Sequence, residues 1–446
     1  MADHFRPTEL NALQTGRSTP SRPPAAVGTR LTAGPGQKAG YERLADHQRR
    51  LGARPAGGRW LLDVLQQSGL RGRGGAWFPT WRKWAAVAEH SDGHSVVVIN
   101  ASEGEPLSAK DRTLISLRPH LVLDGAVLAA DTLGANDIVV YLSRGAQTSE
   151  RTLQSAIKER GRAGLLEPPM HIVRTAHRYI AGEASAVVNR VSGGPSKPRF
   201  TLRRAAENGV DDRPTLVQNV ETLAHVALIA RHGSDWFRTL GTASTPGSTL
   251  MTLWGNVKRP GVYEVDLGAR LGGVLETAGG TVSPPGGALL GGYFGTWLSP
   301  KSLQDLPLDA DTLRSTHQAS LGCGVLAVLP NGSCGVVEAA RIFSYLAAET
   351  AGQCGPCVNG LSAIAETMER IAVSDAVPSD LDQVRRWVDM VRGRGACHHP
   401  DGAVGMLSSA LTVFNDHLGF HVSGQRCHGV DVTGFPQPPI PGRGWR

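Results

Sequence analysis

The sequence predicts an α/β protein in which a parallel-sheet domain is followed by a small α+β unit and a helical bundle. Between residues 58 and 240, apolar β-branched stretches alternate with helical patterns, as in a parallel sheet whose faces are covered. Short strands and a Pro-Gly turn follow over residues 245–330. Amphipathic segments joined by short links then extend over residues 335–420, a pattern that favours a bundle.

The first domain is expected over residues 58–240. Its first helix ends at Gly69, and its strands are SVVVIN (95–100) and DIVVYLS (137–143), both apolar and β-branched. Glycine stops and acidic first turns set the limits of the helices between and after them. The expected helices of this domain beyond the first are residues 119–135, 148–161 and 219–233.

The second unit begins with two expected strands around a Pro-Gly turn, STLMTLWGNVKRPGVYEV (248–265). A short helix (267–280) and the strands in GALLGGYFGTWLS and GVLAVLP complete it. Both ends of the chain differ in composition from these regions. Residues 1–45 are rich in Pro, Gly, Ser and Arg and are expected to form a flexible arm, and residues 421–446 end in a proline-rich tail.

Composition excludes several classes of protein. The 446 residues predict two to four domains, and 41% hydrophobic with 19% charged residues are typical of a globular chain. No apolar run is long enough for a spanning helix, and the N-terminus lacks the apolar core of a signal peptide, so we expect a cytoplasmic protein. The net charge of +7 indicates a modestly basic surface or an acidic partner. Lysine and arginine are scattered without an aromatic stripe, which argues against nucleic acid.

The first motif that could bind a ligand is a glycine-rich stretch from Gly69 to Pro79, GLRGRGGAWFP. Closely spaced glycines let a backbone turn tightly and present N–H groups to a phosphate. Arg73 and Lys83 add positive charge. The spacing is neither that of a dinucleotide fingerprint nor that of a P-loop. A flexible glycine turn without a ligand is the alternative.

The second motif follows the first expected strand directly and reads Asn100-Ala-Ser-Glu103-Gly-Glu105-Pro106. Ligands of parallel sheets bind at the carboxyl ends of the strands. Two carboxylates at such an end could hold ribose hydroxyls or orient a cofactor. An ordinary solvated acidic loop is the alternative.

The six cysteines indicate metal binding or core packing, because a disulfide framework is not expected in a cytoplasmic chain of this length. Cys323 and Cys334 lie in apolar, strand-like sequence and are expected in the core. Cys354-Gly-Pro-Cys357 opens a helical pattern, where thiolates are stabilised, and Cys397 follows. An iron–sulfur cluster usually needs four ligands. The candidates for the fourth are His398, His399, Cys427 and His428.

Taken together, these motifs resemble the NADH-dehydrogenase flavoprotein subunit of respiratory complex I and the related flavin subunits of NAD-linked hydrogenases and formate dehydrogenases. The family's flavin loop GLRGRGGAGFPTGxKW reads GLRGRGGAWFPTWRKW here, and its acidic loop NADExEPGxxKDR reads NASEGEPLSAKDR. YxxGEETAL reads YIAGEASAV, VNNVETL reads VQNVETL, and GHVxxPGVYEV reads GNVKRPGVYEV. The cluster segment ESCGxCxPCREG reads ETAGQCGPCVNG.

The resemblance implies an FMN- and NADH-binding α/β domain over residues 58–240, a β-grasp-like domain over 245–330 and an iron–sulfur-binding bundle over 335–420. NADH would pass a hydride to FMN, and electrons would leave through the cluster to a protein or quinone-linked acceptor. No catalytic side chain is required. The expected partners are NAD(P)H and an electron-accepting protein such as a ferredoxin or a thioredoxin-like iron–sulfur subunit, through which the chain could associate with a membrane.

Matching the family motifs residue by residue implies a set of binding residues. Phe78 would stack on the adenine of NADH, and Glu105 would bind its ribose. The cluster ligands would be Cys354, Cys357 and Cys397, with His398 as the simplest fourth ligand. The complete expected set for FMN and NADH is Gly72, Arg73, Gly74, Gly75, Phe78, Lys83, Asn100, Glu103, Glu105, Glu183 and Asn219.

The sequence departs from the family pattern at each expected site. An indole replaces a family glycine at Trp77, and we expect it to need the space of the nicotinamide pocket. Ala184 replaces a glutamate, and the lost negative charge predicts that NADPH is accepted as well as NADH. Ala351 replaces the first cluster cysteine, which predicts a [3Fe–4S] cluster or a [4Fe–4S] cluster with a non-cysteine ligand. Further departures are Trp81, Ala86 and Ser102. The alternative function is that of a degenerate paralogue, a non-redox binding or assembly subunit.

Overall fold

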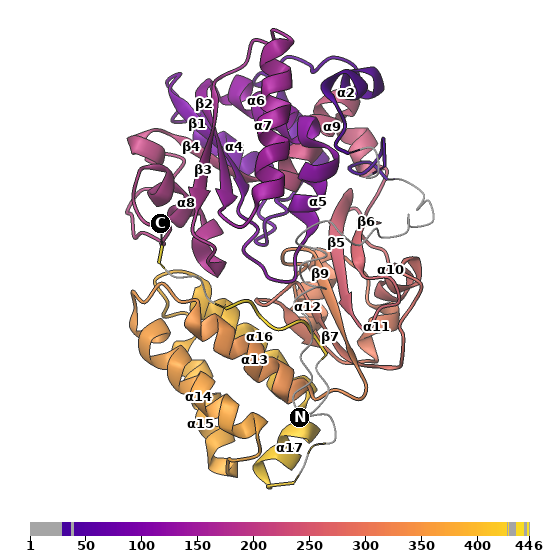
Figure 1. Cartoon of the computed structure of the whole chain (residues 1–446), viewed down its shortest axis with the longest axis vertical. Helices are drawn as coiled ribbons and strands as arrows, with labels where there is room; N and C mark the ends of the chain where they lie inside the picture. Colours follow the sequence, from indigo (N-terminus) through magenta and orange to yellow (C-terminus); the bar gives the residue numbers. More distant parts are fainter. Residues whose placement is uncertain (1–28, 37–39, 426, 428–433, 441–443, 446) are drawn as a thin grey trace.

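The computed structural model of the chain describes residues 29–36, 40–425, 427, 434–440 and 444–445. Figure 1 shows three regions: an α/β region at the top, a mixed sheet with short helices at the lower right, and a helical bundle at the lower left. This order along the chain is the one that the sequence predicts.

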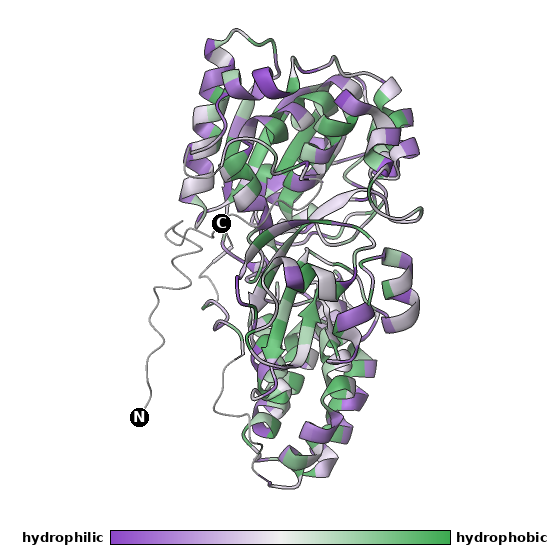
Figure 2. Ribbon diagram, turned by 90° about the vertical axis from the view of Figure 1, so that its right-hand side faces the viewer, coloured by the Kyte–Doolittle hydropathy of each residue, from purple (hydrophilic) through white to green (hydrophobic). Residues whose placement is uncertain are grey.

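A four-stranded parallel sheet, in the order β3-β2-β1-β4, forms the centre of the first region. Its strands are β1 (Ser95–Ala101), β2 (Ala135–Ser143), β3 (Met170–Thr175) and β4 (Thr215–Asn219). The apolar β-branched residues of β1 are almost all buried, and Figure 2 shows the hydrophobic strands enclosed by helices with hydrophilic outer faces. The sequence did not predict β3, a half-exposed strand at the sheet edge, or β4, which has only five residues.

The expected helices of the first region are confirmed. α6 (Pro119–Leu133) is buried along almost its whole length and ends at Gly134, whose φ of 62° suits a glycine. α9 (Val220–Arg238) packs against it and continues past a break at Gly233. The other helices are α2 (Leu44–Leu51), α3 (Trp60–Ser68), α4 (Thr80–Ala88), α5 (Lys110–Leu117), α7 (Gln147–Arg162) and α8 (Ala184–Val191).

The expected flexible arm is packed where the structure describes it. Leu31 is fully buried in the core of the first region. The backbone N–H groups of Arg30, Leu31 and Thr32 all donate to the carboxylate of Glu264. One apolar side chain and one half-buried carboxylate therefore fix this part of the arm, a combination that its composition did not indicate. Residues 1–28 and 37–39 lie outside the described residues.

The second region is a five-stranded mixed sheet in the order β6-β5-β9-β7-β8. The strands β5 and β9 run parallel, and the other neighbours are antiparallel. The expected strand pair around the Pro-Gly turn is confirmed as β5 and β6. The elements are β5 (Ser248–Gly255), β6 (Gly261–Asp266), α10 (Leu271–Thr277), β7 (Pro285–Leu290), β8 (Thr296–Leu298), α11 (Ser302–Asp305), α12 (Ala310–His317) and β9 (Val325–Pro330).

The third region is a helical bundle with a continuous apolar core. A short π-helical turn, η4 (Pro356–Leu361), contains Cys357. The helices are α13 (Gly335–Ala348), α14 (Ser362–Ala372), α15 (Pro378–Val391), α16 (His399–Val413) and α17 (Asn415–Val422). Within the described residues no single helix is long and apolar enough to cross a membrane, although the sharply bent pair α5 and α6 together meets that test by length and composition.

Candidate functional site

The site begins at β1, where the order in which the chain adds strands to the parallel sheet reverses. β1 has β2 on one side and β4 on the other, so the chain leaves β1 for one side of the sheet and later returns to the other. Such a switch point opens a crevice at the carboxyl ends of the strands. Asn100 and Asn219 occupy these ends, side by side in the ladder between β1 and β4. The structure thus brings together two residues that are far apart in the sequence.

The glycine-rich loop lies against this crevice. Its chain turns back on itself, because the Gly72 N–H donates to the Phe78 carbonyl at 2.8 Å. The Arg73 N–H donates to Thr222 Oγ1 at 2.8 Å, at the start of α9. A Cβ atom at Gly74 would lie 3.3 Å from the Cβ of Asn219. Gly72, Gly74 and the N-terminus of α9 therefore converge at the sheet edge, where backbone N–H groups favour a phosphate.

Lys83 brings a positive charge to the same place. It is half-buried, and its Nζ donates to the Val217 carbonyl of β4 at 2.5 Å. Burial lowers the pKa of Lys83 to about 8, and Glu183 opposes this effect. No carboxylate among the described residues forms an ion pair with Lys83. An ammonium group in this state is stabilised by an incoming anion, so Lys83 and the glycine loop fit the phosphate of FMN.

The polar side chains around the crevice are held in fixed orientations. Asn219 caps α9, with its Oδ1 accepting from the Glu221 N–H at 3.0 Å, and its Nδ2 donates to Asp111 at 2.7 Å. Asn100 Nδ2 donates to the Gly182 carbonyl at 2.8 Å. The buried Gln218 Oε1 beside them has no hydrogen-bond partner among the described residues. This oxygen can accept a hydrogen bond from a ligand.

Glu103 has a structural partner that its motif did not reveal. Its carboxylate accepts from the N–H groups of Asp111 and Arg112 at 2.9 and 3.1 Å, at the start of α5. It also pairs with the guanidinium of Arg112 at 3.1 Å. Glu103 therefore stabilises α5 in addition to lying at the rim of the crevice.

Glu105 lies in a pocket between the first and second regions. Only 8% of its surface is exposed. It accepts from the Tyr293 N–H at 2.8 Å and from the Tyr179 hydroxyl at 2.9 Å. Burial raises the pKa of Glu105 to about 7, although these hydrogen bonds lower it in part. The rest of the pocket lining includes Trp254, His177 and, from the C-terminal tail, Pro436, Gln437 and Pro439.

Trp77 lies where the first region meets the second, and the expectation that its indole takes the nicotinamide space stays a prediction. The indole packs into the core of the second region, and its Nε1 donates to the Gly322 carbonyl at 2.8 Å. The Arg73 guanidinium lies 4.3 Å from the ring centroid. The φ of Trp77, 52°, is a conformation that favours glycine. Beside it, Phe78 is 51% exposed and free to stack on a ligand.

The three expected cluster cysteines lie close together on the third region. Cys354 lies just before η4 and Cys357 lies within it, with the two thiols in hydrogen-bonding reach. Burial and the neighbouring Cys354 raise the pKa of Cys357, and burial raises that of Cys397, which lies near enough to sense Cys354. The carbonyl of Ala351, at the position of the missing cysteine, accepts from Lys197 Nζ at 2.8 Å. The donor set therefore fits three of the four ligands of an iron–sulfur cluster.

The candidates for a fourth ligand are separated by the structure. His398 is exposed and directly follows Cys397. His399 is buried, with Nε2 bonded to the Leu346 carbonyl at 2.8 Å, and burial lowers its pKa to about 4. Cys427 lies beside Cys334 instead. Cys334 is buried as expected, but next to His421 as well as apolar neighbours. His428 lies outside the described residues.

Two residues that were not singled out from the sequence connect the crevice to the cysteines. Tyr179 reaches Glu105 through its hydroxyl, and its ring meets that of His399 edge to face at 6.1 Å. Glu349 accepts from the Tyr179 N–H at 2.6 Å. Glu183 caps α8, and its charge acts on both Lys83 and Cys397. Tyr179 lies within the YIAGEASAV motif, which was the available signal.

Comparison with known families agrees with this geometry. Residues 65–228 match the Nuo51 FMN-binding domain, residues 250–288 match the SLBB domain, and residues 338–421 match the NADH-ubiquinone oxidoreductase-F iron-sulfur binding region. The fold and the site thus define a flavoprotein subunit that combines FMN with an iron–sulfur cluster.

Similar proteins identify the family. The chain is 33% identical over 380 residues to the NADH-quinone oxidoreductase F 2 subunit of Rhizobium meliloti (strain 1021), with 82% of this chain and 90% of the relative covered. It is 32% identical to the corresponding F subunit of Streptomyces coelicolor, of which it covers 84%. The chain belongs to the family of NADH-quinone oxidoreductase F subunits.

Solved structures extend this likeness. A chain of an NAD+-reducing [NiFe]-hydrogenase in the air-oxidized state aligns with a TM-score of 0.75 and 31% identity, over 82% of this chain. This chain spans 62% of the length of that hydrogenase chain. The family resemblance and the predicted fold class are therefore confirmed. The matched FMN and iron–sulfur regions support NADH-linked electron transfer and favour the oxidoreductase over the non-redox alternative.

Proposed function

We propose that this chain is an NADH-oxidising flavoprotein subunit that delivers electrons to a partner protein through an iron–sulfur cluster. FMN supplies the change from a two-electron hydride to single electrons, which the cluster can carry. The observation that carries this proposal is the convergence of Lys83, the glycine loop and the N-terminus of α9 at the sheet's switch point. We assign FMN and NADH binding to a domain over residues 58–240 and iron–sulfur binding to a bundle over residues 335–420, with a β-grasp-like domain over residues 245–330 between them.

We assign binding of the FMN phosphate to Lys83 and the backbone N–H groups of Gly74 and Gly75, while Gly72 closes the turn of the loop through its N–H bond to the Phe78 carbonyl. The half-buried ammonium neutralises an anion without competing with a carboxylate partner. Gly75 has a φ of 111° and open space at the Cβ position, so a ligand can approach its backbone. Arg73 acts from behind the loop, because its side chain binds the Ser248 carbonyl and faces Glu221.

We assign NADH to the open side of the loop. The exposed ring of Phe78 offers a stacking face for adenine. Glu105 would accept hydrogen bonds from ribose hydroxyls, provided that a ligand displaces part of its contact with Tyr293 or Tyr179. Ala184 at the start of α8 leaves Glu183 as the sole acidic residue of the motif there. We therefore expect the chain to use NADPH as well, and comparable rates with both nucleotides would support this.

We assign the cluster to Cys354, Cys357 and Cys397, with His398 as the fourth ligand. His398 is exposed and adjacent to Cys397, so its ring can turn toward a cluster without displacing core side chains. Electrons would leave from this surface. A basic chain with a net charge of +7 favours an acidic electron carrier, such as a ferredoxin or a thioredoxin-like iron–sulfur subunit.

Flavin binding and reduction by NADH test the proposal. The apoprotein is titrated with FMN, and the loaded protein is then mixed anaerobically with NADH while the flavin absorbance is followed. Lys83→Gln should weaken FMN binding at least tenfold, equivalent to about 1.4 kcal/mol, because the phosphate loses its cation. The exposed Lys158→Gln is the matched control and should bind FMN normally. A chain that binds no FMN, or equal affinity in both variants, would refute the assignment.

A further inference from the structure

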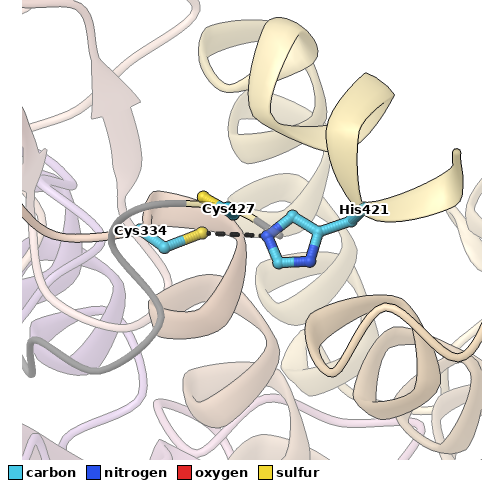
Figure 3. A group of neighbouring side chains, drawn as sticks. All are labelled: Cys334, His421 and Cys427. Atoms are coloured by element: carbon cyan, nitrogen blue, oxygen red, sulfur yellow. Dashed lines mark hydrogen bonds between the residues drawn. The ribbon is translucent and has the colours of Figure 1, made fainter. Parts of the chain in front are cut away.

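A second group of metal-binding side chains lies in the third region, distinct from Cys354, Cys357 and Cys397. Figure 3 shows Cys334, His421 and Cys427 turned toward one another. Their ligand atoms all lie within 4.8 Å of each other, and all three residues are buried. Cys334 Sγ and His421 Nε2 are 3.2 Å apart. Two thiols and an imidazole in one buried space need an explanation beyond packing.

The fold brings these residues together from three places in the chain. Cys334 directly precedes α13, His421 lies on α17, and Cys427 follows α17. Gly335 makes this approach possible: a Cβ atom there would lie 2.3 Å from the ring of Phe414, at the junction of α16 and α17. Burial raises the pKa of the Cys334 thiol, and the backbone N–H groups at the start of α13 oppose this effect only in part.

A second histidine is placed to complete the group. His417 lies one helical turn before His421 on α17, and residues four apart share a helix face. Its Nδ1 lies 3.8 Å from Cys427 Sγ. Cys334, His421 and Cys427 form the mutually close group, and His417 adds a nitrogen donor beside Cys427. Two sulfur and two nitrogen donors are typical of tetrahedral zinc.

We propose that Cys334, His417, His421 and Cys427 bind a single zinc ion in a structural site. In tetrahedral zinc, with bonds of about 2.3 Å to sulfur and about 2.0 Å to nitrogen, neighbouring sulfur and nitrogen ligands lie about 3.5 Å apart. The two sulfur–nitrogen distances, 3.2 and 3.8 Å, bracket this value. A two-iron cluster would place its cysteines and histidines on different irons and hold them farther apart.

The surroundings of His421 support a ligand role. Its Nδ1 lies 3.1 Å from Ser374 Oγ, which leaves Nε2 directed at Cys334. A hydrogen bond on the second ring nitrogen is the usual way in which a metal-binding histidine is oriented. Cys334 and Cys427 lie outside residues 338–421, which match the iron–sulfur binding region, whereas His417 and His421 lie within them. None of the four is one of the expected cluster cysteines, so the proposed site is a different set of residues.

The proposed ion would anchor the C-terminal tail. After Cys427, the Gly434 N–H donates to Glu338 at 2.6 Å, and Phe435 stacks on Trp297 at 5.7 Å. The tail then lines the Glu105 pocket. A zinc ion would tie the start of this tail to α13 and α17, as structural zinc sites join segments that pack weakly on their own.

Metal analysis of the full chain tests the proposal. The chain is purified after growth with zinc, and zinc, iron and sulfide are counted on one sample by elemental mass spectrometry. We expect about one zinc per chain. Cys427→Ser should lose the zinc and keep the iron, whereas Cys354→Ser should lose iron and keep the zinc. Cys323→Ser, a cysteine outside both groups, should keep both.

Substitution with cobalt gives a second readout. Co²⁺ in a tetrahedral sulfur and nitrogen site gives intense visible bands, which should persist in Cys354→Ser and weaken in His417→Gln. His417 is half-exposed, so this variant is expected to fold, and its zinc affinity should fall at least tenfold. Zinc that follows Cys354 rather than Cys427, a zinc-free wild-type chain, or a Cys334–Cys427 disulfide in the isolated protein would each overturn the proposal.

Discussion

The two groups of cysteines in the third region differ in how they are built. Cys354 and Cys357 are three residues apart, the first just before the short π-helical turn η4 and the second within it, and they form a local motif. Cys334 and Cys427 are far apart in the sequence and meet in a buried space beside His421. The first group matches a family pattern but lacks one ligand at Ala351. The second has four possible ligands and no local pattern.

This difference shows what each kind of site requires from the protein. A cluster site made by a local motif can be recognised by spacing alone, because one turn of backbone positions two thiols. A site made by convergence depends on close packing elsewhere, here on Gly335 and the ring of Phe414. We therefore expect the two groups to respond differently to substitution.

The largest effect, a loss of iron, is expected at the Cys354–Cys357 motif. Cys354→Ser removes one of only three thiolate ligands, so we expect most of the iron and sulfide to be lost while FMN remains bound. Iron, sulfide and flavin counts on the same sample measure this. Iron that stays at the wild-type level would show that Cys354 is not a ligand.

Removing a ligand from the group of Cys334, His417, His421 and Cys427 should instead lower the free energy of unfolding. A zinc ion at a free concentration one hundred times its Kd contributes about 2.7 kcal/mol to the folded state. Cys427→Ala should lose this contribution, and a chelator should destabilise the wild-type chain but leave the variant unchanged. Thermal unfolding with and without chelator measures both. A chelator effect of equal size in the two chains would contradict a zinc site at Cys427.

Glu105 extends the comparison to a buried group in the flavin-binding region. Its pKa is raised from 4.5 to about 7, so the folded state binds its proton more tightly than the unfolded state does. The protonated Glu105 carboxyl therefore stabilises the folded chain fully below pH 4.5. About 3 kcal/mol of this stabilisation is lost as the pH rises through 7.

Glu105→Gln keeps an acceptor for Tyr293 and cannot ionise. The difference in unfolding free energy between this variant and the wild type should therefore change between pH 4.5 and 7. Denaturant titrations at several pH values measure it. A difference that does not vary with pH would show that Glu105 has the same pKa in the folded and unfolded chains.

The smallest effect is expected at the proposed fourth ligand. His398→Gln should lower the iron content from about four to about three per chain, because a [3Fe–4S] cluster needs only three thiolates. In the background of Ala351→Cys, which restores the missing cysteine, the same substitution should have no effect. Loss of iron in both backgrounds would mean that His398 supports the fold rather than the cluster.

The sequence predicts features set by neighbouring residues better than features that join distant parts of the chain. The order of the three regions, the helix stop at Gly134 and the Cys354–Cys357 pair all follow from short patterns. The strand β4 was missed because five residues carry little periodicity, although it places Asn219 beside Asn100. The direction of Trp77 could not be predicted, since it depends on how two separate cores pack together.

A motif also cannot show how deeply a residue is buried or which residues it contacts. Glu103 and Glu105 stand two residues apart in one acidic loop, yet one caps α5 and the other is enclosed between two tyrosines. Cys334 was expected in the core on its apolar neighbours alone. It is buried, but its contact with His421 joins residues 87 positions apart, which no local pattern encodes.

Anaerobic reduction by NADH is the sharpest test of electron transfer from NADH through FMN to the iron–sulfur cluster. The reconstituted chain is mixed with NADH, the flavin absorbance is followed, and the sample is frozen for electron paramagnetic resonance. We expect NADH to bleach the flavin and a reduced iron–sulfur signal to appear in the wild type. In Cys354→Ser, the flavin should still bleach without that signal. If the chain holds FMN and iron but NADH leaves its flavin unchanged, the chain is not an NADH-oxidising subunit.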